Sequence, residues 1–153
     1  RMFRPSEPGF VCRQVFEVGW ALYASERYIA EHGRPATVAD LERHQLVLYV
    51  ESMHRAEPMR WLEAHRGRAT GISRVDNTEV ASQATSAGGG IAVLPCFVAE
   101  SLPGMIRLFA DPVAANTGWI VYHESIRDSA RIRAAVDALV VYFEAHRVMM
   151  AGR

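Results

Sequence analysis

The chain has 153 residues, half of them apolar, and its seventeen basic residues, all of them Arg, match seventeen acidic ones. High apolar content and zero net charge exclude a disordered chain, and the length suffices for one folded domain. With only Cys12 and Cys96, the chain is not a disulfide-stabilised scaffold, and no apolar run reaches the roughly 18 residues of a membrane span. Zero net charge also argues against a stand-alone basic nucleic-acid-binding module.

The first residues, Arg-Met-Phe-Arg-Pro, contain neither an initiator methionine nor a helix start, and no signal peptide is visible. We expect them to be the end of a strand in a chain whose upstream part is missing. Alternation over residues 18–23 predicts a strand buried on both faces, followed by a short helix that Ser25 caps and Gly33 ends. Thr37 caps a second short helix over 38–44, and residues 45–50 form the next strand.

The rest of the chain continues this alternation of strands and helices. We expect helices over residues 59–67, 77–87, 97–101 and 129–147, and strands over 70–75, 91–94, 105–109 and 118–123. Asp76 or Asn77 caps the helix that starts there, and Asp76 with Glu79 resembles a capping box. Strands separated by helices predict an α/β fold with a mainly parallel sheet.

Motifs for catalysis or metal binding are missing from the sequence. The glycines at 88–90 follow a helix and precede a strand, which is the reverse of a phosphate-binding loop, so we interpret them as a helix end and a tight turn. The six histidines show no metal-ligand spacing, and no Gly-x-Ser-x-Gly sequence is present. We interpret Cys12 and Cys96 as buried free thiols. We therefore expect no catalytic residue, no metal site and no cofactor.

The transition from strand to helix at Val75-Asp76-Asn77-Thr78 is the one candidate binding feature. The first N–H groups of a helix have no partner within it, and in open α/β sheets such ends face the ligand crevice. Asn77 and Thr78 offer hydrogen bonds beside this positive helix end, which suits a small carboxylate. The alternative is that Asn77 only caps the helix.

Residues 20–50 contain Tyr-Ile-Ala-Glu-His-Gly-Arg-Pro and then Asp-Leu-Glu-Arg-His, and residues 77–95 run from Asn77 to Ala-Gly-Gly-Gly-Ile-Ala-Val-Leu-Pro. These segments, in this order, resemble the LysR-type transcriptional regulators. Tyr122 and His123, followed by residues 129–143, are similar to the closing strand and helix of that family. The resemblance covers essentially the whole chain.

The resemblance implies an α/β, type 2 periplasmic-binding-protein-like effector domain with two Rossmann-like subdomains, the first one incomplete here. Residues 1–17 and 119–153 would belong to subdomain one, and residues 18–118 to subdomain two. The DNA-binding helix-turn-helix and the first strand–helix units of subdomain one would be absent, which should leave apolar surface of the last helix uncovered.

The resemblance also implies which residues line the effector cleft between the subdomains. These are Arg1, Met2 and Phe3 at a strand end, Tyr49, Val50 and Glu51 after the next strand, Asn77 and Thr78 at the helix start, and Trp119 or Ile120 near the returning hinge. Because Glu51 is a poor partner for an anion, the class of effector stays open.

The implied partners are a small-molecule effector, further copies of the same chain in a homodimer or homotetramer, and DNA only through the missing helix-turn-helix. The implied location is cytoplasmic, without a membrane partner. A transporter's solute-binding protein, which shares the two-lobed fold, is the alternative. An α/β enzyme is a weaker one, because no nucleophile–base constellation is present.

Overall fold

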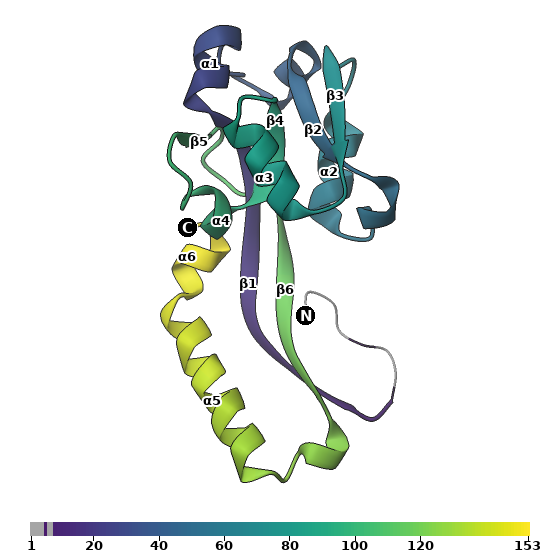
Figure 1. Ribbon diagram of the computed structural model, residues 1–153, viewed down its shortest axis with the longest axis vertical. Helices are drawn as coiled ribbons and strands as arrows, with labels where there is room; N and C mark the ends of the chain where they lie inside the picture. Colours follow the sequence, from purple (N-terminus) through teal and green to yellow (C-terminus); the bar gives the residue numbers. More distant parts are fainter. Residues whose placement is uncertain (1–4, 6–7) are drawn as a thin grey trace.

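A six-stranded mixed sheet organises the computed structural model, which describes residue 5 and residues 8–153. The strand order is β3-β2-β4-β1-β5, and β6 pairs with β1 off this path. Helices α1 to α4 surround the upper part of the sheet in Figure 1, while β1 and β6 extend together away from it toward α5. The described chain is therefore an α/β unit with a long two-stranded extension.

The elements alternate along the chain much as the sequence predicts. The strands are β1 (Phe10–Ser25), β2 (Gln45–Tyr49), β3 (Gly71–Val75), β4 (Ile91–Pro95), β5 (Met105–Arg107) and β6 (Ala114–His123). The α-helices are α1 (Glu26–His32), α2 (Glu57–His65), α3 (Thr78–Ser86), α4 (Cys96–Ala99), α5 (Ala130–Ala145) and α6 (Arg147–Ala151). Short 3₁₀ helices are η1 (Val38–Arg43), η2 (Glu51–Met53) and η3 (Glu124–Ile126).

The sheet has one strand that runs against the others. Strand β2 pairs in parallel with β3 and with β4, whereas β1 pairs antiparallel with β4, β5 and β6. Within the described residues, five strands thus point one way and β1 points the other. Because β1 lies between three neighbours, three of the five pairings are antiparallel, so the mainly parallel sheet expected from the sequence is a mixed one.

The predicted caps form as expected at two of the helix starts. The Ser25 Oγ accepts the N–H of Tyr28, and Gly33, with φ of 80°, donates its N–H to the carbonyl of Ile29. At η1, the Asp40 carboxylate accepts the N–H of Thr37 at 2.8 Å, which completes a capping box. Local hydrogen bonding therefore fixes where these short helices begin.

The hydrophobic core lies in the α/β unit and ends part of the way along β1. From Val18 onward every residue of β1 is buried, whereas Phe10–Glu17 is half-buried or exposed. Three tyrosines, Tyr23, Tyr28 and Tyr49, are the largest fully buried side chains of the described chain. The buried half of β1 is the half whose alternation predicted a strand from the sequence.

The C-terminal residues return to this core. The predicted single helix ends at Ala145, and after a break at His146 the short helix α6 packs beside β1. Its Met150 is 7% exposed and belongs to the core cluster, and Arg107 donates from Nη1 to the carbonyl of Gly152 at 2.9 Å. The C-terminal segment is thereby attached to the α/β unit rather than to the extension alone.

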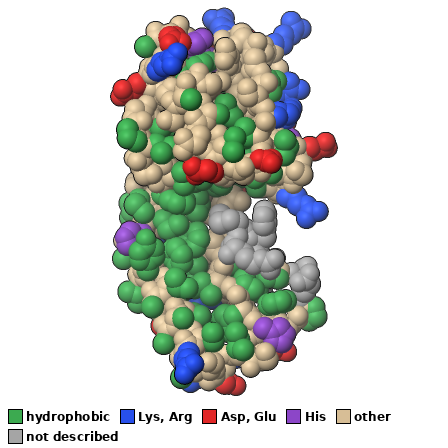
Figure 2. All heavy atoms as spheres, in the orientation of Figure 1, with side chains coloured by type: hydrophobic (Ala, Val, Ile, Leu, Met, Phe, Trp, Pro, Cys, Tyr) green, Lys and Arg blue, Asp and Glu red, His purple; other side chains and the backbone are tan. Residues whose placement is uncertain are grey.

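Helix α5 covers the extension with one face and exposes apolar side chains on the other. Val136 and Val140 are buried, and the ring of Phe143 lies 4.3 Å from that of Phe16 on β1. Apolar side chains gather over α5 and α6 in Figure 2, and the exposed ones are Leu139, Val141, Tyr142, Val148 and Met149. Uncovered apolar surface on the last helix is thus present, as the sequence led us to expect.

Candidate ligand-binding site

Asn77 uses both ends of its side chain within the protein. Its Oδ1 accepts the N–H of Val80 at 2.8 Å, and its Nδ2 donates to Asp76 at 2.8 Å. Asn77 is therefore the cap of α3. The expected capping box from Asp76 to Glu79 does not form, since Glu79 instead accepts a bond from Gln83.

Thr78, the first residue of α3, lies in the wall of a pocket of about 330 Å³. The pocket is bounded by side chains from β1, from η2, α2 and the segment between them, from α3 and from β6. They are Trp20, Ser52, Met53, Arg55, Ala56, Met59, Thr78 and Asn116. Most of this wall is apolar, and the volume lies in the range of small-molecule sites.

Two polar atoms on residues of this wall have no hydrogen-bond partner among the described residues. They are Nε1 of Trp20, a side chain that is 6% exposed, and Oδ1 of Asn116, and both atoms are buried. In the antiparallel ladder of β1 and β6, Val18 pairs with Asn116 and Trp20 with Ala114. Trp20 and Asn116 are therefore diagonal neighbours on one face of this ladder. A buried polar group without a partner is unusual in a folded protein, so these two atoms require an explanation.

Tyr49 lies behind Thr78 and is buried. Its hydroxyl donates to the carbonyl of Val93 at 3.3 Å. Burial raises the pKa of Tyr49 to about 12, and a side-chain hydrogen bond with Thr78 opposes that shift. The structure thus brings Tyr49 and Thr78 together, with Tyr49 supporting the pocket wall from the core side.

Glu51 lies at a different place, in an open and charged depression. Its neighbours there are Val50, His54, Glu63 and Arg74. Arg74 donates to both carboxylate oxygens of Glu63, at 3.0 and 3.1 Å, and this bond lowers the pKa of Glu63. The structure therefore separates Glu51 from the pocket that Thr78 lines.

The remaining predicted site residues either lie outside the described part of the chain or do not line this pocket. Arg1, Met2 and Phe3 lie outside the described residues. Trp119 and Ile120 pair with Gln14 and Arg13 in the β1–β6 ladder, beyond the pocket.

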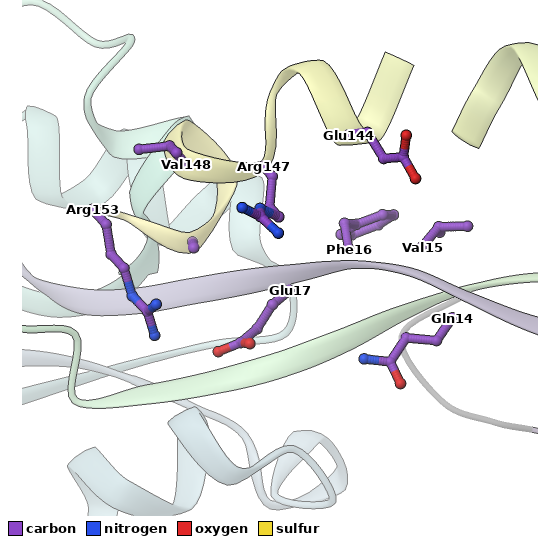
Figure 3. Close-up of a pocket in the computed structure, with 9 residues that line it drawn as sticks. Gln14, Val15, Phe16, Glu17, Glu144, Arg147, Val148 and Arg153 are labelled. Atoms are coloured by element: carbon purple, nitrogen blue, oxygen red, sulfur yellow. The ribbon is translucent and has the colours of Figure 1, made fainter. Parts of the chain in front are cut away.

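A second, larger depression of about 620 Å³ lies between β1 and the C-terminal helices. Figure 3 shows its side chains, which come from β1 on one side and from α5, α6 and the C-terminus on the other. Its charged members, Glu17, Glu144, Arg147 and Arg153, are all exposed to solvent. Because water solvates these charges and both signs are present, this depression selects no particular ligand charge.

Neither a metal cluster nor a membrane-spanning helix is found where the chain is described. No group of three or more His, Cys, Asp or Glu side chains in that part of the chain is placed to hold a metal ion. Over the same residues, no helix is both long and apolar enough to cross a membrane.

The α/β unit, its antiparallel two-stranded extension and a pocket where the two join define a domain with the periplasmic-binding-protein-like fold. The chain belongs to the LysR substrate binding domain family, whose model matches residues 1–143.

Relatives of known identity agree with this assignment. The HTH-type transcriptional regulator DmlR of Escherichia coli (strain K12) is 26% identical over 145 residues, which cover 91% of this chain and 47% of that protein. The chain thus spans about half the length of this curated relative.

Solved structures show the same fold. The regulatory domain of CrgA, a LysR-type transcriptional regulator from Neisseria meningitidis, superposes with a TM-score of 0.73 at 21% identity, covering 94% of this chain and 73% of that one. The full-length virulence activator AphB of Vibrio cholerae gives a TM-score of 0.66 at 18% identity, covering 91% of this chain and 50% of that one.

Proposed function

We propose that this chain is the ligand-sensing region of a LysR-type bacterial transcription regulator. It binds a small molecule in the pocket beside α3, and the bound ligand changes how the whole protein binds DNA. The observation that carries the proposal is the position of the pocket, because Thr78 and both long strands, β1 and β6, contribute to its wall. The family membership of the chain supports the same conclusion.

The two long strands provide the means of coupling. Both contribute a side chain to the pocket, Trp20 from β1 and Asn116 from β6, and both continue toward α5. We assign residues 18–118 to one subdomain, and residues 1–17 and 119–153 to part of another. A ligand that binds one inter-subdomain angle better than another shifts the population toward that angle.

We infer distinct contributions from the predicted site residues. Thr78 contacts the ligand, Tyr49 supports Thr78, and Asn77 fixes the start of α3. Glu51 lies in the neighbouring charged depression with Arg74, and Met2 and Phe3 contribute to the site from the other subdomain. The site carries out no catalysis and requires no cofactor.

The partners follow from the same proposal. The E. coli relative is named an HTH-type regulator, and we infer that DNA is contacted by such a domain outside this chain. The protein acts in the cytoplasm as a homodimer or homotetramer. The matched family does not favour the alternative of a transporter's solute-binding protein.

The test uses the complete regulator and a panel of small metabolites. A ligand is identified by its effect on melting temperature and on the mobility of the operator complex. Thr78→Val keeps the shape of the side chain but removes its hydroxyl, and it should weaken the response to that ligand by roughly tenfold, the equivalent of one hydrogen bond of about 1.4 kcal/mol. Thr70→Val, outside the pocket, is the matched control.

An unchanged response in the Thr78 variant would show that the pocket is misplaced. Residues 1–153 alone should give no sequence-specific mobility shift at moderate salt, because the DNA-binding part lies elsewhere. A specific shifted band with these residues alone would contradict the division of labour that we propose.

A further inference from the structure

The pocket beside α3 carries information about the chemistry of its ligand. Its apolar lining is formed by Trp20, Met53, Ala56 and Met59. Among the described residues that line it, Arg55 is the one with a charge, and its side chain is exposed to solvent. An exposed guanidinium keeps its hydration and gives little selectivity for an anion.

The unpartnered atoms of the wall specify what the ligand must offer. The indole N–H of Trp20 can only donate, whereas Oδ1 of Asn116 can only accept. Their residues are diagonal neighbours on one face of the β1–β6 ladder and both line the pocket, so a ligand bound there lies beside both residues. A hydroxyl accepts from the indole and donates to the amide oxygen.

A carboxylate fits this wall less well. It satisfies the indole N–H but has no proton for Oδ1 of Asn116, and it must shed its hydration against Met53 and Met59. A purely apolar molecule satisfies neither polar atom. We propose, building on the proposed function, that the pocket takes a small uncharged alcohol or phenol with an apolar body, whose hydroxyl lies between Trp20 and Asn116.

The test compares three probes that share one ring: benzyl alcohol, benzoate and toluene. Dissociation constants are measured by ligand-observed NMR on the complete regulator. Benzyl alcohol should bind at least about tenfold more tightly than benzoate or toluene, because a site with buried hydroxyl partners discriminates against ligands that lack the hydroxyl. Trp20→Phe removes the N–H together with the five-membered ring and keeps an aromatic side chain. It should weaken benzyl alcohol binding about tenfold more than it weakens toluene binding, which reports the loss of ring volume alone.

Two further variants keep the result interpretable. Asn116→Ala should weaken benzyl alcohol binding in the same way, which covers the case in which Trp20→Phe does not fold. Trp61→Phe is the matched control, because Trp61 is half-buried, lies outside the pocket and stacks on His65. It should bind all three probes as the wild type does.

Specific outcomes would overturn the inference. Tighter binding of benzoate, equal binding of toluene, or no binding of any probe would each refute the ligand class. The proposed function would still stand if the regulator responded to another molecule in a Thr78-dependent way. Loss of that dependence would refute the proposed function itself, so the two failures can be told apart.

Discussion

Replacing Gly19 with Ala tests whether α6 is packed against β1. A Cβ built on Gly19 would clash with the carbonyl oxygen of Ala151 and lie 2.7 Å from its carbonyl carbon. Both contacts are far below van der Waals distance, and neither atom belongs to a flexible side chain. Since Gly19 has no unusual φ, the effect of the substitution comes from this close approach alone.

The protein can respond in two ways, and their magnitudes decide between them. Shifting α6 outward by about 1 Å is an overpacking cost of about 1–3 kcal/mol. Releasing α6 exposes Met150, at about 1.5–3 kcal/mol, and breaks the charged hydrogen bond from Arg107 to Gly152, at about 1.5–3 kcal/mol more. The shift is cheaper, so α6 should stay attached in a strained position.

A matched variant removes the intrinsic effect of the substitution. Gly71 also lies in a strand, and a Cβ there meets only the Gln45 side chain at an ordinary 3.5 Å. Gly71→Ala should therefore stabilise the protein by about 0.5–1 kcal/mol. In urea unfolding, Gly19→Ala should be less stable than Gly71→Ala by about 1–3 kcal/mol. Equal stability of the two variants would refute the packing of α6 on β1.

Two other predictions concern the pH dependence of stability and the turn at glycines 88–90. His44 is 6% exposed, and burial lowers its pKa below the ordinary value of 6.5, with the charge of His32 acting in the same direction. Its contribution to stability is therefore complete above about pH 6.5 and is lost as the pH falls toward the folded-state pKa. The free energy of unfolding should fall as the pH is lowered from 7 to 5, and it should fall less steeply in His44→Gln. Parallel curves for the two proteins would exclude His44 as a cause of this pH dependence. A Cβ on Gly89 would lie 2.8 Å from the carbonyl oxygen of Ala84. Gly89→Val should therefore reduce the free energy of unfolding by at least about 1 kcal/mol and lower the melting temperature. An unchanged melting curve would contradict the structural role of this turn.

The sequence predicted the elements whose signals are local. The caps at Ser25 and Asn77, the helix end at Gly33 and the buried strands of the α/β unit follow from hydrogen-bonding side chains, glycine and apolar runs a few residues long. The outer half of β1, Phe10–Glu17, and residues 114–117 of β6 were missed for the opposite reason. Phe10 pairs with His123, more than one hundred residues away, and no local pattern announces such a partner.

The pocket was predictable only in part for the same reason. Thr78 was found because a helix start after a strand has unpaired N–H groups. Trp20 looked like an ordinary core residue, and Asn116 stood outside the predicted strand. Their shared face exists only through the register that pairs Trp20 with Ala114, so the donor and the acceptor come together only in the folded ladder.

This ladder also contains a bulge. Its register shifts between Gln14 and Phe16, so Val15 is an extra residue, and such bulges bend and twist a strand pair. The pocket lies on the core side of this irregularity, at Trp20, and α5 packs at it through Phe16 and Phe143. In the function that we propose, a ligand held between Trp20 and Asn116 ties β1 to β6 on one side of the bulge only. The ligand then fixes the relative position of the two strands on the core side of the bulge. Through the bulge it controls the direction of the outer parts of the two strands, and with it the angle between the subdomains.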